Sequence, residues 1–190
     1  PADTWPEGAT RHEGFSFLFG GDARAHEVHI CGQLTPATAY TYRVGGEGAW
    51  SSTHTFTTAP SPDSTATLRL AFTGDSRGAP EVFGQLLSQM DALEPDVILF
   101  SGDMVQLGPN QDEWDDWWDA AGDIPARRLL VPTHGNHEFL ALNYFAQFAM
   151  PNNEQWFTIR YGPLQLLSLN DTVADPVEIS EQQPVFIRET

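Results

Sequence analysis

The stretch Val97-Ile98-Leu99-Phe100-Ser101-Gly102-Asp103 decides the fold class of this 190-residue chain. Its four apolar residues follow one another without alternation, which is typical of a strand covered on both faces. The run then meets a glycine, which lets the backbone turn sharply, and an acidic side chain. The stretch therefore predicts a buried strand of a parallel sheet, with Asp103 at the sheet edge where ligands bind.

Two more strands of this kind are expected, one on each side along the chain. Leu68 to Thr73 leads into Gly74-Asp75, and Leu129 to Val131 leads toward His134-Gly135-Asn136-His137-Glu138. The three strand ends should therefore bring two carboxylates, an amide and an imidazole to one rim. Such oxygen and nitrogen donors suit Mn, Fe or Zn, and a carboxylate can bridge two metal ions.

Apolar residues at helical spacing occupy the intervals between these strands. The spacing predicts helices over Pro80–Leu93 and Gln111–Ala121, and a hairpin is expected from Trp156 to Leu169. Strands and helices that alternate in this way predict an α/β fold, a mainly parallel sheet with flanking helices. The tryptophans of the second helix, Trp114, Trp117 and Trp118, share one face, and we expect them to pack on the sheet.

The first 58 residues have a different sequence pattern, which is typical of an all-β domain. Residues 39–44 alternate between apolar and polar side chains, as in a half-buried strand. Further strands are expected at 15–19, 27–30 and 53–57. The Pro- and Ser-rich residues 59–66 predict a linker. The expected domains are therefore a partial β-sandwich over 1–58, the linker over 59–66 and the α/β domain over 67–190.

Composition excludes several functional classes. The chain has 26 acidic and 9 basic residues and a formal charge of −17, which argues against a nucleic-acid footprint. No apolar run reaches the ~18 residues of a membrane span. The single cysteine, Cys31, cannot form an internal disulfide. The acidic balance still allows an anionic substrate held by metal ions.

Three motifs in order carry a family resemblance. Gly74-Asp75, Gly102-Asp103 and Gly135-Asn136-His137-Glu138 resemble the first three signature blocks of the calcineurin-like metallophosphoesterases. Leu34–Tyr42 resembles a fibronectin type III signature, in which a tyrosine hydrogen-bonds back to the preceding corner. Together they resemble the purple-acid-phosphatase-like branch, which implies a metallophosphoesterase-type sandwich behind a partial fibronectin type III-like domain.

The resemblance also implies roles for individual residues. It assigns Asp75 to one metal ion, Asp103 to both and Asn136 to the other, and it places His137 on the phosphate and the leaving group. The implied cofactors are two divalent or mixed-valence ions (Fe, Mn or Zn). The implied reaction is hydrolysis of a phosphoester or phosphorylated small molecule, and relatives of this kind are typically exported, which predicts an extracytoplasmic location.

Three departures from the family pattern stand beside this resemblance. Arg77 occupies a position where these enzymes usually have a histidine ligand, and we expect it to contact substrate phosphate instead. Gln106 stands where purple acid phosphatases have a tyrosine. No histidine follows His137, so we expect a chain that lacks the C-terminal half of the catalytic domain and is itself inactive and poorly stable.

Two other functions remain open at this level. Gly74-Asp75-Ser76 resembles the nucleophile block of GDS esterases, which would make Ser76 an acyl-attacking serine. The departures also allow a non-catalytic, phosphatase-like binding module. His134 is expected to be structural or to contact the site residues without binding metal or substrate itself. The sequence leaves the oligomeric state undetermined.

Overall fold

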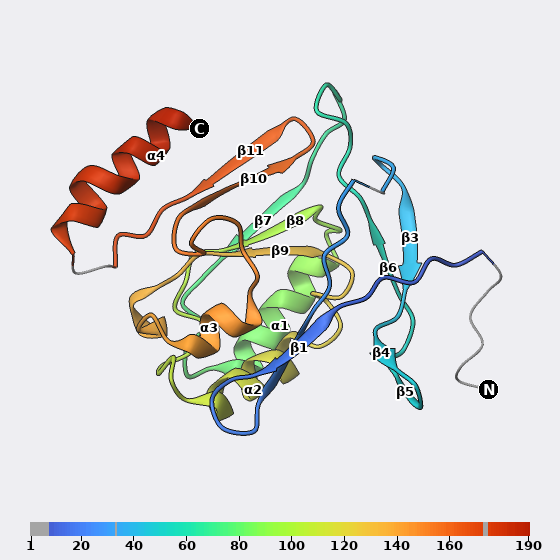
Figure 1. Cartoon of the computed structure of the whole chain (residues 1–190), viewed down its shortest axis with the longest axis horizontal. Coiled ribbons are helices and arrows are strands. Elements are labelled where there is room, and N and C mark those ends of the chain that lie inside the picture. The colour runs from blue at the N-terminus through green and yellow to red at the C-terminus, as the bar shows by residue number, and fades with distance from the viewer. Residues whose placement is uncertain (1–7, 33, 173–174) are drawn as a thin grey trace.

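A computed structural model describes residues 8–32, 34–172 and 175–190 of the chain (Figure 1). At its centre is a three-stranded sheet of β7 (Leu70–Thr73), β8 (Val97–Phe100) and β9 (Leu129–Pro132). Both neighbouring pairs are parallel, and β8 lies in the middle. The predicted parallel sheet is therefore confirmed, with β7 starting two residues later and β9 ending one residue later than expected.

Two helices cover one face of this sheet. They are α1 (Pro80–Asp91) and α2 (Gln111–Ala121), which lie below the sheet in Figure 1. Phe83 of α1 stacks on Trp117 of α2 with ring centroids 4.9 Å apart, and both contact Phe100 of β8. Trp114 and Trp117 are buried, which confirms that the tryptophan face of α2 packs into the core.

A hairpin covers the opposite face. It consists of β10 (Phe157–Tyr161) and β11 (Leu164–Ser168), which pair antiparallel as the sequence predicts. Phe157 and Tyr161 form a second core cluster with Val97 and Val131 of the sheet. The sheet thus has a helical layer on one side and a β layer on the other.

Short elements that the sequence pattern did not predict complete the α/β part. They are η1 (Asn136–Glu138), α3 (Leu142–Gln147), the π-helical η2 (Glu178–Gln182) and α4 (Gln183–Glu189). The side chain of Gln183 exchanges two hydrogen bonds with the backbone of Asn170, of 3.0 and 2.6 Å, and so fixes the start of α4.

The N-terminal strands form three separate antiparallel pairs. These are β1 (Phe15–Leu18) with β2 (Arg24–Glu27), β3 (Ala39–Tyr42) with β6 (His54–Thr57), and β4 (Gly45–Gly46) with β5 (Ala49–Trp50). The structure does not show a fibronectin type III-like sandwich, which stays a prediction together with the domain boundaries. The hydroxyl of Tyr40 does accept a hydrogen bond of 2.9 Å from the Thr35 N–H at the preceding corner.

One N-terminal strand was predicted at the wrong place. We expected a strand over residues 27–30, whereas β2 ends at Glu27. The tight turn that Phe19 closes with Ala23 sets the register of the hairpin, so that Phe15 pairs with Glu27. The side-chain alternation after Glu27 therefore has no partner strand in this pair.

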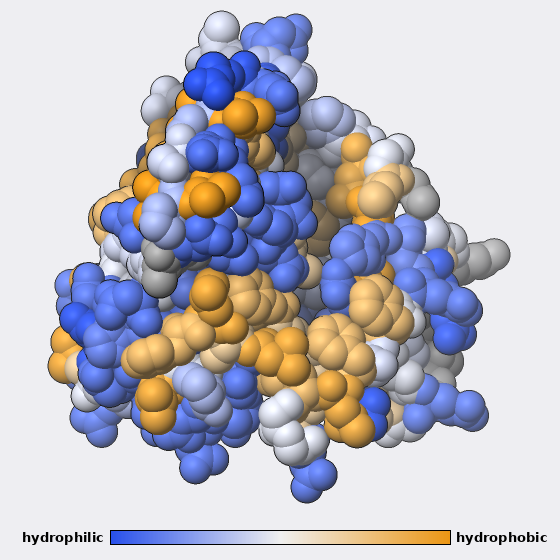
Figure 2. Space-filling view, turned by 60° about the vertical axis from the view of Figure 1, so that its left-hand side comes forward, coloured by the Kyte–Doolittle hydropathy of each residue, from blue (hydrophilic) through white to orange (hydrophobic). Residues whose placement is uncertain are grey.

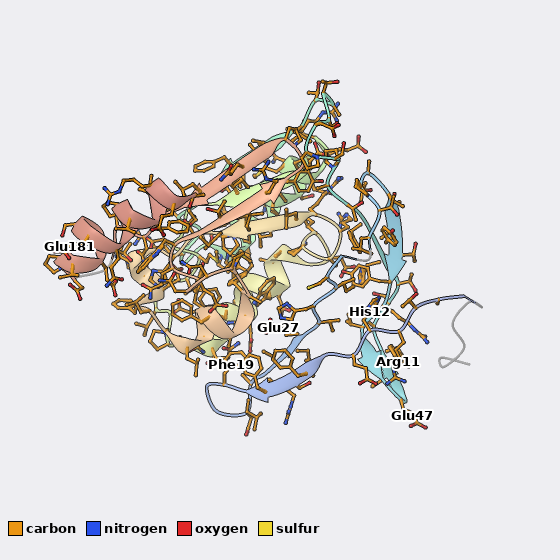
Figure 3. All side chains as sticks on the ribbon, turned by 45° about the horizontal axis from the view of Figure 1, so that its top comes forward. Arg11, His12, Phe19, Glu27, Glu47 and Glu181 are labelled. Carbon is orange, nitrogen blue, oxygen red and sulfur yellow. The ribbon has the colours of Figure 1, made fainter. Side chains whose placement is uncertain are left out.

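The N-terminal pairs contact the α/β part. The hydroxyl of Tyr42 donates a hydrogen bond of 2.7 Å to the carbonyl of Ala126, and Phe19 at the end of the first hairpin is buried (Figure 3). Acidic side chains such as Glu47 and Glu181 project at the periphery in the same view. Among the described residues, no helix is both long and apolar enough to cross a membrane.

Candidate active site

The loops that follow the three parallel strands meet at one rim. The backbone N–H of Asp75, after β7, donates to the carbonyl of Gly102, after β8, at 3.1 Å. A Cβ on Gly102 would lie 2.7 Å from the Cα of Gly135, after β9. Only glycine allows two backbones to approach so closely. The predicted meeting of these three strand ends is therefore observed.

Asp75 and Asp103 occupy matching positions in this arrangement. Both have a left-handed backbone, with φ of 53° and 58°, which aspartate tolerates better than most residues. Asp103 is buried, and its Oδ1 accepts a hydrogen bond of 3.0 Å from the backbone N–H of His137. The Asp75 side chain is largely exposed. The rim thus has one carboxylate held in the protein and one open to solvent.

Arg77 connects the two carboxylates. Its Nη2 lies 3.1 Å from Asp75 Oδ1, and its Nη1 lies 3.1 Å from Asp103 Oδ2. Its backbone N–H also donates to the Asp103 carbonyl at 3.3 Å. The sequence suggested a phosphate contact for Arg77, and it did not predict that the guanidinium would hold both acidic residues.

His137 is oriented by the loop after β8. Its Nδ1 lies 2.7 Å from the carbonyl oxygen of Gln106. A carbonyl only accepts hydrogen bonds, so this contact assigns the proton of the ring to Nδ1 and leaves Nε2 free for other groups. The ring of Phe139 lies edge-on to the imidazole at 6.0 Å.

Glu138 is the site residue whose role the sequence reasoning missed. It is fully buried and accepts hydrogen bonds from three backbone N–H groups, those of Asp103 at 2.9 Å, Met104 at 2.8 Å and Gly135 at 2.7 Å. Burial raises its pKa, although these three N–H groups act in the opposite direction. Glu138 therefore joins the loops after β8 and β9. The sequence feature that could have indicated this role is the place of Glu138 in the Gly-Asn-His-Glu block.

His134 and Asn136 take different positions around the rim. Asn136 is exposed and begins η1, directly before His137. His134 is buried, accepts a hydrogen bond of 3.0 Å from the Leu140 N–H at Nε2, and contacts Thr172 through Nδ1. Burial lowers its pKa to about 4. His134 is thus structural, as the sequence suggested.

Ser76 is committed to structural hydrogen bonds. Its hydroxyl donates to the Met104 carbonyl at 3.0 Å and accepts from the Trp117 indole N–H at 3.0 Å. A serine nucleophile must instead give its proton to a base, usually histidine. The structure therefore argues against the esterase alternative.

The donor atoms at the rim fit a metal ion in chemical type. Asp75, Asp103 and Asn136 offer the oxygen ligands that Mn and similar ions accept. Within residues 8–32, 34–172 and 175–190, however, no group of three or more His, Cys, Asp or Glu is placed to hold a metal ion. The rim therefore offers carboxylate and amide oxygens, and Arg77 holds its two carboxylates.

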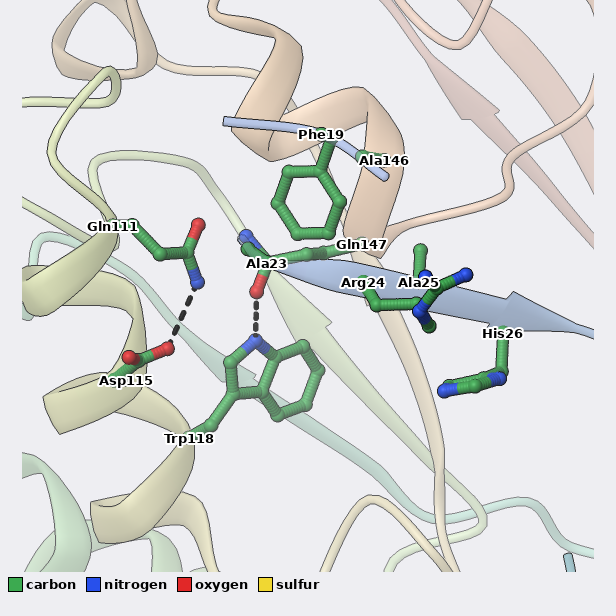
Figure 4. Close-up of a pocket in the computed structure, with 10 residues that line it drawn as sticks. All are labelled: Phe19, Ala23, Arg24, Ala25, His26, Gln111, Asp115, Trp118, Ala146 and Gln147. Atoms are coloured by element: carbon green, nitrogen blue, oxygen red, sulfur yellow. Dashed lines mark hydrogen bonds between the residues drawn. The ribbon is translucent and has the colours of Figure 1, made fainter. Parts of the chain in front are cut away.

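A separate hollow lies between β2 and the helices α2 and α3 (Figure 4). Four of its polar side chains pair with one another: Trp118 donates to Gln147 at 2.6 Å, and Gln111 donates to Asp115 at 2.8 Å. Trp118 is thus held against α3 by its indole N–H, which agrees with the packing expected for the tryptophan face of α2.

Comparisons with known proteins agree with this arrangement. The family model described as calcineurin-like phosphoesterase matches residues 68–181. The chain is 30% identical over 153 residues to purple acid phosphatase 22 of Arabidopsis thaliana, covering 76% of this chain and 33% of that protein. It is 29% identical over 149 residues to purple acid phosphatase 21 of the same plant, covering 74% and 32%.

A solved structure shows the same fold. It is a purple acid phosphatase from yellow lupin (Lupinus luteus) seeds, with a TM-score of 0.77 and 17% identity, covering 97% of this chain and 41% of that chain. The chain spans about a third of the length of the curated relatives it matches. Because the family model matches more than half of the chain, and does so over the strands that build the rim, this chain belongs to the calcineurin-like phosphoesterase family.

Proposed function

We propose that the protein containing these residues hydrolyses phosphate esters, as a phosphatase or phosphodiesterase. The observation that carries the proposal is the meeting of Asp75, Asp103 and His137 at the ends of three successive parallel strands. Membership of the family and the purple acid phosphatase relatives support it. The substrate class is a phosphorylated small molecule or another phosphoester.

The proposed cofactors are two divalent or mixed-valence ions, Fe, Mn or Zn. Asp75, Asp103 and Asn136 are the residues of this chain that would hold them. When bound, such ions polarise the phosphoryl oxygens and supply an activated water.

Two side chains of the chain would act on the substrate directly. The hydrogen bond from His137 Nδ1 to the Gln106 carbonyl leaves Nε2 for the substrate. A ring protonated on both nitrogens would give the Nε2 proton to the leaving oxygen, a role worth roughly 10²–10⁴-fold in rate. Each terminal nitrogen of Arg77 directs one contact to a carboxylate. A guanidinium has five N–H donors, so others remain for a phosphate oxygen.

The test is substitution of Asp103 by asparagine in protein that contains residues 1–190. Asp103→Asn should abolish hydrolysis of p-nitrophenyl phosphate, because it removes a carboxylate charge while keeping the side-chain shape. The far-UV circular dichroism should stay unchanged. Asp112→Asn, at an exposed position of α2, is the matched control and should keep full activity. Near-normal turnover by Asp103→Asn would contradict the proposal.

A non-catalytic binding module is the second candidate function. The observation in its favour is the Arg77 guanidinium, which holds both carboxylates of the rim. A module of this kind would bind inorganic phosphate or a phosphoester without turnover. Saturable binding of phosphate by a protein with no hydrolysis in Mn²⁺ or Zn²⁺ would favour it over the enzyme.

A further inference from the structure

The positive charge of Arg77 would repel any metal ion that binds the same two carboxylates. The guanidinium is always protonated and places one nitrogen 3.1 Å from Asp75 and the other 3.1 Å from Asp103. We propose that Arg77 is a resident cation of the rim, and that a metal ion reaches Asp75 and Asp103 only by displacing it. This inference rests on the proposed function, because it takes these carboxylates as metal ligands.

The electrostatic argument concerns two carboxylates that face one cation. Without Arg77, Asp75 and Asp103 would repel each other, and the site would attract a divalent ion strongly. With Arg77 in place, one positive charge already offsets part of the two negative charges. A metal ion bound to the same oxygens would stand within a few ångströms of the guanidinium, where like charges interact strongly because the surroundings are partly buried.

The backbone holds Arg77 in this place independently of its charge. Its own N–H donates to the Asp103 carbonyl at 3.3 Å. The preceding residue, Ser76, is fixed between the Met104 carbonyl and the Trp117 indole, each at 3.0 Å. Two hydrogen bonds, one from Ser76 and one from Arg77, thus attach the loop after β7 to the loop after β8. They keep the backbone of Arg77 beside Asp103.

The Asp103 carboxylate, which accepts from Arg77, is also held in place by a hydrogen bond. Oδ1 of Asp103 accepts the His137 N–H at 3.0 Å, which leaves Oδ2 for Arg77. The Asp103 side chain is only 11% exposed, so solvent screens this pair weakly. By contrast, Arg69 and Glu94 are 3.8 Å apart with side chains 65% and 75% exposed, which makes Arg69 a suitable control cation.

The experiment is a titration of the metal-stripped chain with Mn²⁺ by calorimetry, with thermal unfolding in EDTA and in Mn²⁺. Arg77→Ala should bind Mn²⁺ about tenfold or more tightly than wild type, because the competing charge is gone. In EDTA, Arg77→Ala should unfold at a lower temperature than wild type, and Mn²⁺ should raise that temperature more in the variant than in wild type. Arg69→Ala should match wild type in both assays.

Two further variants secure the result. Arg77→Gln removes the charge and keeps a shorter, polar side chain, so it should reproduce the gain in affinity even if Arg77→Ala folds poorly. Adding Asp75→Asn to Arg77→Gln should remove the gain, which places the metal at this rim.

Equal Mn²⁺ affinities of wild type and Arg77→Gln would overturn the inference, and so would the absence of Mn²⁺ binding to both. The outcome does not depend on turnover. A loss of the proposed phosphatase function would appear in the Asp103→Asn assay, whereas a failure of this inference would appear in the Mn²⁺ titration.

Discussion

At the scale of single residues, Glu138 shows how one buried carboxylate organises a site that it does not enter. One of its oxygens accepts the N–H groups of Asp103 and Gly135, and the other accepts that of Met104. Glutamine at this position would turn an NH₂ group toward at least one of these donors. We expect Glu138→Gln to lower the free energy of unfolding by about 2–3 kcal/mol.

Urea denaturation measures this loss directly. Glu81→Gln is the matched control, since Glu81 is exposed in the first turn of α1 and should change stability little. If the two variants share the wild-type midpoint, the three hydrogen bonds of Glu138 do not stabilise the fold.

The sequence could predict which polar residues meet at the rim, because each follows a buried strand. Asp75, Asp103 and His137 are found from that pattern alone. The partners that they take could not be predicted in this way. The ion pairs of Arg77 and the hydrogen bonds of Glu138 depend on how two loops lie against each other, and strand periodicity carries no information on that.

At the scale of elements, Asp91 attaches the end of α1 to the segment before β9. Its Oδ1 lies 2.9 Å from Arg128 Nε, and its Oδ2 lies 2.7 Å from Arg127 Nη2. Burial raises the pKa of Asp91, but the hydrogen bonds and charges of Arg128 and Arg127 outweigh it and hold the pKa below 3.8. The pairs therefore stabilise the fold at pH values above 3.8, and this contribution is lost as the pH falls through the folded-state pKa.

We expect Asp91→Asn to lower the free energy of unfolding by about 1 kcal/mol at pH 7, a modest value because Arg127 is partly exposed. The difference from wild type should shrink as the pH falls below 3.8, because the wild-type carboxyl is then protonated, first in the unfolded state and at lower pH in the folded state. Urea denaturation at several pH values measures both effects, with Asp119→Asn on the exposed face of α2 as control. A difference that stays constant down to pH 2–3 would show that the charge of Asp91 is not responsible.

The elements that the sequence predicted well are those with a full period of apolar residues. The predicted and observed bounds of α2 and β8 coincide, since each buries a continuous face. The elements that it missed are short. η1 has three residues and α3 has six, too few to show a period, and the N-terminal strand at Arg24–Glu27 is placed by a turn rather than by its own pattern.

At the scale of the whole molecule, apolar surface remains outside the two core clusters. Large apolar side chains are exposed near the rim, at Phe139, Leu140 and Leu142, and on α4, at Val185 and Ile187. Figure 2 shows apolar side chains gathered on the side of the molecule that carries α3 and α4. The formal charge of −17 opposes contact between copies through such surfaces, and salt weakens that repulsion.

The sheet edge at β7 is an apolar surface at which charge repulsion between copies can be tested. Phe72, Leu99 and Val131 are neighbours across the three strands on the face that the hairpin covers. Val131 is 3% exposed, whereas Phe72 is 71% exposed, so the hairpin covers this face of β9 and leaves the same face of β7 open. β7 is also an outer strand of the sheet that the described residues form, and the edge of an outer strand can pair with another chain.

We therefore expect the chain to self-associate at about 1 M salt, where the Debye length is ~3 Å and the negative charges no longer keep copies apart. Phe72→Thr should reduce this association, because threonine keeps the strand propensity and removes the apolar surface. Size-exclusion chromatography with light scattering measures the mass. Leu93→Thr is the matched control, since Leu93 is 72% exposed but lies in the turn after α1 and not on a strand edge. If Leu93→Thr reduces the mass as much as Phe72→Thr does, general hydrophobicity rather than the open strand drives the association.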